Sequence, residues 1–95
     1  MRLAEHAAVV VWFATERDRV VSYSIVLLAL QEGTWRTVRV YDNAHGQNEM
    51  HRHTLRSGKQ AAEVFSQVSD FGVAMRSARE EVLAGYEKMI EGWRR

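Results

Sequence analysis

The sequence predicts an α+β fold: a three- to four-stranded antiparallel meander followed by one long or two consecutive C-terminal helices packed on the sheet. The run Ala7–Phe13 is continuously apolar and rich in β-branched residues, and residues 35–41 alternate strictly between two faces. Apolar residues from Val64 to Trp93 recur every three or four positions. The first two patterns are typical of strands and the third of an amphipathic helix. At 95 residues, the chain is expected to form one domain, residues 1–95.

Four segments predict the strands, and the sheet is expected to cover about 6–56. They are Ala7–Phe13, residues 20–30, residues 35–41 and a short fourth segment, Met50–Leu55. Glu32-Gly33 supplies a tight turn between the second and third strands, because Gly adopts positive φ without steric cost. Strands joined by short turns pair antiparallel with their neighbours in the chain, which predicts a meander.

The helical part is expected over about 58–94. Ser57 and Gln60 have the spacing of a capping box, in which Ser is the N-cap and Gln lies three residues on. A continuous helix of about 35 residues would be about 52 Å long, which is longer than the strands. Two outcomes remain open: a break near Asp70–Gly72, or a continuous helix whose far end, Tyr86–Trp93, packs against a second chain. Both leave an apolar stripe to cover, so a homodimer through this helix is expected.

Composition places the chain among ordinary globular domains, with 46% apolar and 26% charged residues. It has no cysteine, which excludes disulfides and thiolate metal sites. The N-terminus carries charges where a signal peptide needs an apolar run, and no apolar stretch reaches the roughly 20 residues of a membrane span. A cytoplasmic protein without membrane contact is expected.

Charge is unevenly distributed although the net charge is only +1. The middle of the chain, residues 36–59, contains two acids, Asp42 and Glu49, against five basic residues. A local excess of this kind favours an anionic ligand such as phosphate, and it also occurs on an ordinary solvated sheet edge. The basic residues are Arg36, Arg39, Arg52, Arg56 and Lys59.

Three histidines lie in the same region. In a strand, His51 and His53 point to one face, about 6.5–7 Å apart. Two imidazoles at that distance can act as acid and base on a phosphodiester, or can bind one metal ion together with His45. Arg39 and Tyr41, on one face of the preceding strand, can reach the same cleft if the strand register allows. An ordinary polar strand edge is the alternative for the histidine pair.

The loop after residue 41 has two further interpretations. Asp42 and Asn43 are typical of a turn, since Asx side chains hydrogen-bond to their own backbone. Asp42 is accordingly expected to cap and orient, with catalysis as the alternative. No Gly-rich phosphate loop, nucleophile elbow or His-Glu-x-x-His motif is present, which disfavours acyl transfer and P-loop nucleotide hydrolysis.

The stretch Arg39-Val40-Tyr41-Asp42-Asn43-Ala44-His45, followed by His51-Arg52-His53, resembles the signature of the TumE-type toxins of bacterial and archaeal toxin–antitoxin pairs. The close match covers about 20 residues, and the chain lacks the proline that usually follows this signature. The resemblance implies a growth-inhibiting toxin with a cognate antitoxin, often a DNA-binding one.

The resemblance thus implies the toxin of such a pair, and the histidines and arginines predict that it acts on RNA as a metal-independent endoribonuclease without a cofactor. Arg39 would hold the phosphate, His51 and His53 would act as acid and base, and Tyr41 or Asp42 would orient them. The remaining polar residues are expected to bind substrate: Arg36, Asn43, His45 and Arg52.

Two alternatives belong to other functional classes. The chain can be a non-enzymatic interaction or regulatory protein that binds a partner through its sheet and long helix. It can also be a metal-binding domain that uses His45, His51 and His53.

Overall fold

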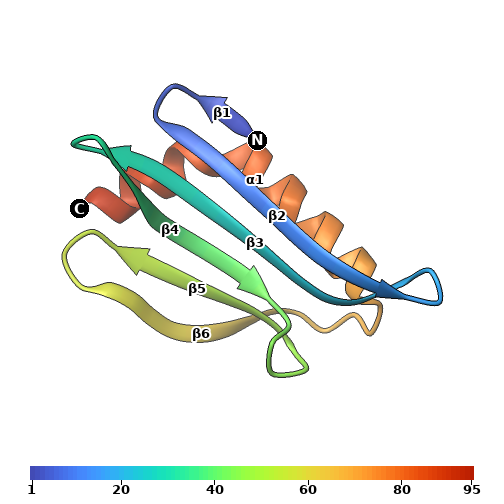
Figure 1. Ribbon diagram of the computed structural model, residues 1–95. Helices are drawn as coiled ribbons and strands as arrows, with labels where there is room; N and C mark the ends of the chain where they lie inside the picture. The colour runs from blue at the N-terminus through green and yellow to red at the C-terminus, as the bar shows by residue number, and fades with distance from the viewer.

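A computed structural model describes all 95 residues and confirms the α+β class. Six antiparallel strands follow one another in the sheet in chain order, and one C-terminal helix packs on them (Figure 1). The meander is therefore confirmed, whereas the expected number of three to four strands is too small. The elements are β1 Arg2–Ala4, β2 Ala7–Glu16, β3 Arg19–Gln31, β4 Thr34–Asp42, β5 Asn48–Thr54, β6 Gly58–Ser66 and α1 Phe71–Arg94.

Two-residue turns join the long central strands. Arg17 and Asp18 between β2 and β3 have φ of 51° and 63°, and Glu32 and Gly33 between β3 and β4 have 50° and 80°. Positive φ at both central residues defines the type I′ turn, whose twist matches that of the flanking strands. These turns fix the neighbouring strands in antiparallel register.

The segment from residue 58 to residue 66 corrects the prediction of a helix beginning after Ser57. Gly58 has φ of 72° in the turn between β5 and β6, and residues 58–66 pair with β5. The sheet therefore extends beyond residue 56. The spacing of Ser57 and Gln60 matches a capping box, but no helix follows it.

The helix begins at Phe71, thirteen residues later than the predicted start at 58. Asp70 is its N-cap, and the Asp70 Oδ1 accepts a hydrogen bond from the amide of Val73 at 3.1 Å. Gly72 lies in the first turn, so the glycine near the expected break marks the beginning of the helix. With 24 residues, α1 is about 36 Å long and no longer exceeds the sheet.

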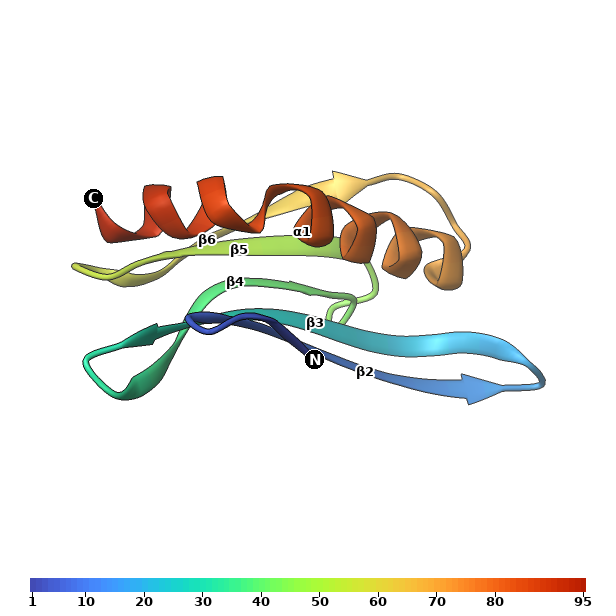
Figure 2. The same ribbon diagram turned by 90° about the horizontal axis from the view of Figure 1, so that it is seen from above.

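One face of the sheet packs against α1, and the sheet curves so that β5 and β6 lie beside the helix (Figure 2). The core joins apolar residues of β2, β3, β4 and β5 to one stripe of the helix, including Ala74, Val82, Ile90 and Trp93. This stripe is buried within a single chain. The uncovered stripe that motivated a dimer through the helix is therefore absent. No helix is both long and apolar enough to cross a membrane.

Candidate functional site

The register between β4 and β5 decides which predicted site residues share a face. Arg39 pairs with Arg52, and Val40 pairs with His51. Cross-strand partners lie on the same face and consecutive residues on opposite faces. Arg39 and Arg52 therefore lie on the face that packs against α1, whereas His51 lies on the other. The predicted grouping of Arg39 with His51 is wrong.

Alternation alone would place His53 on the face of His51, but the register of β5 with β6 shifts between these two residues, and His53 lines a cavity together with Arg39 and Arg52. The cavity measures about 450 Å³ and lies between β4, β5, β6 and the last turns of α1. His53 and Thr54 from β5 contribute to its wall, and Lys88 and Trp93 contribute from the helix. The only acid in the wall is Glu63, which forms an ion pair with Arg52 at 2.6 Å.

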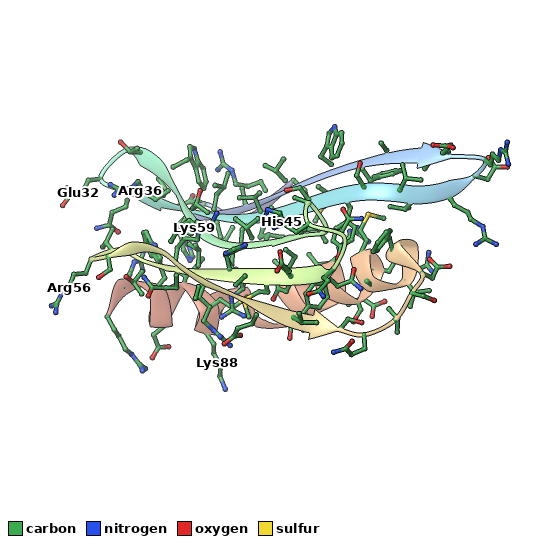
Figure 3. The ribbon with its side chains drawn as sticks, turned by 90° about the horizontal axis from the view of Figure 1, so that it is seen from below. Glu32, Arg36, His45, Arg56, Lys59 and Lys88 are labelled. Atoms are coloured by element: carbon green, nitrogen blue, oxygen red, sulfur yellow. The ribbon has the colours of Figure 1, made fainter.

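His53 adjoins a second hollow of about 400 Å³ beyond the end of β5, where Arg36 and Arg56 lie. Figure 3 shows Arg36, Arg56, Lys59 and Lys88 toward one end of the molecule, with Glu32 beside Arg36 and His45 nearer the middle. Arg39 and Arg52 line the adjoining cavity.

The surroundings of His53 keep its imidazole uncharged. Burial lowers the pKa of His53 below its usual 6.5, and the charges of Lys59 and His51 lower it further. A histidine with a lowered pKa is neutral at pH 7, so one ring nitrogen can accept a proton. His53 is thus a proton acceptor among cationic groups.

Arg39 is held through a chain of side chains that ends on the helix. The Arg39 Nη1 donates to the Tyr41 hydroxyl at 3.5 Å, and that hydroxyl donates to the Glu81 Oε2 at 2.5 Å. The Arg39 Nε is buried and has no hydrogen-bond partner. A buried donor without an acceptor costs about 1–3 kcal/mol, so an anion that reached it would recover that cost.

Tyr41 is a positioning residue here, since its hydroxyl retains its proton. Burial, with the hydrogen bond to Glu81, raises the pKa of Tyr41 to about 12. The neutral phenol is favoured in the folded chain, so its contribution to stability is complete below pH 10 and disappears as pH rises toward 12.

We expect the free energy of unfolding to fall over this interval, measured by urea denaturation at each pH. Tyr41→Phe should flatten the decline without removing it, because burial also raises the pKa of Tyr23. An unchanged decline in Tyr41→Phe would contradict this assignment.

The loop residues Asp42 and Asn43 shape the backbone. Asp42 accepts a hydrogen bond from the amide of Ala44 at 3.1 Å, as in an Asx turn. Asn43 is buried, accepts from the amide of Tyr23 at 2.9 Å, and donates to the carbonyl of Val21 at 3.1 Å. Its amide thus continues the ladder on β3 where β4 ends. Neither residue is part of the cavity wall.

Asn48, which the sequence interpretation did not single out, joins three parts of the fold. It is buried, accepts from the Tyr23 hydroxyl at 2.7 Å, and donates to the carbonyl oxygens of Ser66 and Val68 at 3.4 and 3.0 Å. These bonds tie β3 and β5 to the segment that leads into α1. Asn43 and Asn48 therefore stabilise the scaffold that supports the site.

The other two histidines of the region lie apart from the cavity. The His51 Nδ1 is 3.3 Å from the carbonyl oxygen of Gln60, so this nitrogen donates, since a carbonyl can only accept. His45 is 77% exposed and contacts Glu49 at 3.0 Å. The structure contains no cluster of three or more His, Cys, Asp or Glu side chains that could hold a metal ion. The alternative site of His45, His51 and His53 is therefore not assembled.

Four wall residues come from the helix, and none of them was predicted for the site: Lys88, Met89, Gly92 and Trp93. Lys88 was not assigned, and Trp93 was attributed to the helix stripe that would meet a second chain. Their position depends on how α1 crosses the sheet. The amide of Leu55, just beyond β5, donates to the carbonyl of Trp93 at 2.8 Å. This bond fixes the end of the helix beside the cavity.

Comparison with known proteins identifies one family, described as a domain of unknown function (DUF7718), whose model matches residues 1–95. No curated protein and no solved structure matches the chain.

Proposed function

Because the chain belongs to the DUF7718 family, whose function is unknown, we propose a function from its site: the cavity binds an RNA phosphodiester and cleaves it. The observation that carries the proposal is a neutral histidine, His53, in one cavity with Arg39, Arg52 and Lys88. This combination provides a proton acceptor and fixed positive charge for a phosphate group.

Phosphate binding is supported by the donors of the two arginines. Each guanidinium has five N–H groups, and its planar fork fits phosphate oxygens. Arg39 uses Nη1 in a long bond to Tyr41 and leaves Nε without an acceptor. Arg52 forms an ion pair with Glu63, and both side chains are about half exposed. Exposed ion pairs contribute little to stability, so Arg52 can exchange this partner for phosphate.

The cleavage step requires a proton acceptor and a proton donor. His53 takes the proton of the ribose 2′-hydroxyl, the 2′-oxygen attacks phosphorus, and the bond from phosphorus to the 5′-oxygen breaks. The leaving oxygen receives a proton from Lys88, whose ammonium group belongs to the same wall. The products are a 2′,3′-cyclic phosphate and a free 5′-hydroxyl. His51, on the other sheet face, has no part in this scheme.

The biological setting we propose is that of a toxin neutralised by a cognate antitoxin. It rests on the resemblance of residues 39–45 and 51–53 to the TumE-type signature. In this chain Arg39 and His53 of that signature belong to the cavity, whereas Asp42 and Asn43 build its support. Expression should then arrest growth, and a second gene product should relieve the arrest.

Purified protein should cleave a 5′-labelled single-stranded RNA in the presence of EDTA. The fragments should end in a 2′,3′-cyclic phosphate, detected by mass spectrometry. DNA of the same sequence should remain intact, since it lacks the attacking hydroxyl. Intact RNA, or cleavage that needs a metal ion, would contradict the mechanism.

Binding can be measured separately from cleavage on an RNA with 2′-methoxy groups. Arg52→Gln should weaken binding and reduce the slope of log affinity against log salt by about 0.7, the value per phosphate contact on a single strand. Arg79→Gln, which removes an exposed arginine of α1 outside the cavity, is the matched control and should leave both quantities unchanged. Equal effects of the two substitutions would place RNA elsewhere on the surface.

A second candidate function, a non-enzymatic interaction protein, is favoured by the exposed apolar side chains of β2. Trp12 and Phe13 are 56% and 52% exposed and lie outside the cavity. In that case the RNA assay is negative, and alanine at His53 leaves binding to the partner intact.

A further inference from the structure

Most of β2 forms an open edge of the sheet. On its outer side β1 pairs with Ala7 and Ala8 only, and Val9 exchanges backbone hydrogen bonds of 2.9 and 2.7 Å with Met1. Figure 1 shows β1 beside the beginning of β2, while the rest of β2 continues to its turn with β3 on one side and no strand on the other. The segment 10–16 pairs only with β3 and has no neighbour on its outer side.

Residues 10–15 of this edge lack the charged side chains that usually prevent strands from associating, and the register of β2 with β3 shifts only near the end of the segment, between Ala14 and Thr15. Residues 10–15 contain no charged residue and no proline, and Val10, Trp12 and Phe13 are each at least half exposed. The opposite edge strand, β6, carries Lys59 and Glu63 and has an irregular register with β5. Charged side chains protect edges in natural sheets, so the two edges differ in charge: β6 carries charges along its exposed length, whereas residues 10–15 of β2 carry none.

The free backbone groups follow from strand alternation. In an antiparallel strand, every second residue directs its N–H and C=O to the same neighbour. Val9 directs both toward Met1. Val11, Phe13 and Thr15 therefore present their N–H and C=O groups at the open edge, in the row to which another strand can hydrogen-bond.

We propose that a second copy of this chain pairs with the edge, β2 against β2, antiparallel about a two-fold axis at Phe13. The register follows from the length of the open edge: a pairing centred on Phe13 covers 10–16 in both copies without displacing β1. Val11 then exchanges hydrogen bonds with Thr15 of the second copy, and Phe13 with Phe13 of the second copy. All six free N–H groups gain an acceptor.

The side chains fit this register. The two-fold axis is perpendicular to the sheet, so both helices lie on the same side and the sheet gains six strands. On the helix face, Phe13 lies beside its own counterpart at the axis. On the other face, the large Trp12 lies opposite the small Ala14 of the second copy. Aromatic side chains in a cross-strand pair stabilise it.

The exposed aromatic side chains supply roughly a third of the area that a small dimer interface buries. Four half-exposed aromatic rings bring on the order of 400 Å² to the axis, because each such side chain can bury about 150–250 Å². Stable interfaces bury about 1,200–2,000 Å² in total, so the exposed Val10 and Val11, Thr15 and the backbone of the paired strands must supply the rest of a small interface. The dimer should therefore dissociate on dilution.

Sedimentation velocity over a concentration series tests the proposal. The wild-type chain should change from monomer to dimer, and Phe13→Glu should remain monomeric at every concentration. Val64→Glu is the matched control, because Val64 is 45% exposed on β6 and should not affect association. A wild-type chain that is monomeric throughout, or a dimer that Phe13→Glu leaves intact, overturns the proposal.

A single cysteine tests the register, and the natural chain has none to interfere. Hydrogen-bonded partners in antiparallel strands have Cα atoms about 5.5 Å apart, within the range that a disulfide spans. Phe13→Cys should therefore form a disulfide-linked dimer under mild oxidation. In Val10→Cys the two thiols would lie about 20 Å apart along the strands, and that variant should not cross-link. The reverse result, or no cross-link in either variant, overturns this register even where Phe13→Glu fails to fold.

Discussion

Replacing His53 with alanine should lower the rate of RNA cleavage about 10²- to 10⁴-fold, the usual contribution of a general base. The side chain is the only imidazole in the cavity with Arg39 and Arg52, and its lowered pKa keeps it able to accept a proton at neutral pH. Single-turnover cleavage of labelled RNA measures the effect. The pH profile should lose activity on the acid side only below pH 6.5, since His53 must be neutral to act.

The matched control for this substitution is His45→Ala, because His45 is 77% exposed and lies outside the cavity. It should cleave at the wild-type rate. His51→Ala distinguishes a mechanism with one catalytic histidine from a mechanism with two. His51 lies on the face of the sheet opposite Arg39, so the one-histidine mechanism predicts cleavage at the wild-type rate. If His51→Ala is as inactive as His53→Ala while still folded, the two histidines act together and the role proposed for Lys88 is wrong.

Replacing Asn48 with alanine should cost roughly 3 kcal/mol of folding stability. The substitution removes the acceptor of the Tyr23 hydroxyl and the donor to the carbonyls of Ser66 and Val68, in a buried position. Each buried polar group left without a partner costs about 1–3 kcal/mol. For a domain of this size the melting temperature should fall by roughly 12–24 °C.

Urea denaturation and calorimetry measure this loss directly. Gln47→Ala is the matched control, because Gln47 is the exposed neighbour of Asn48 and makes no side-chain hydrogen bond in the structure. It should change stability by less than about 0.5 kcal/mol. A loss below about 1 kcal/mol in Asn48→Ala would mean that water replaces the amide, and that the segment leading into α1 is held by other contacts.

Much of the sheet could be predicted from the sequence, because its strands have alternating or continuously apolar residues and are joined by recognisable turn residues. Within residues 35–41, polar and apolar residues alternate from Thr37 to Val40, which predicts the strand found there, and Glu32-Gly33 gives the expected tight turn. The register shift in β4 opposite Leu27 and Leu28 leaves no such signal. It turns the buried Val38 toward the helix beside Arg39, because the neighbouring strands must accommodate an extra residue.

The segment 58–66 shows why the boundary between sheet and helix was misplaced. Val64 and Val68 have helical spacing with Phe71, so the periodicity continues across a real change of structure. Gly58 and Asp70 mark where the sheet continues and where the helix begins. Gly58, with its positive φ, closes a hairpin, and Asp70, three residues before Val73, caps the helix. Asp70 lies within the predicted break and was interpreted as a residue that interrupts a helix, whereas it is the N-cap that begins one.

The candidate site could be predicted only for the residues that lie close together in the sequence. Arg36, Arg39, Arg52 and His53 lie close together in the chain, so their clustering is visible in the sequence. The separation of His51 from Arg39 depends on a register that composition does not encode. Lys88 lies far along the chain from these residues. It reaches the cavity only because α1 runs back across the sheet, so that the last turns of the helix lie beside the cavity.

The position of β6 has a consequence for access to the cavity. This strand forms one wall, yet most of its residues are exposed, and it is held mainly by its ladder with β5. Segments with few buried contacts open locally at a small fraction of the global unfolding free energy. A strand that lifts from the rim while β2, β3 and β4 stay intact would admit a polymer from the side. The cavity could then receive an internal stretch of a polymer through the side that β6 closes, and no free end of the polymer would have to be threaded in.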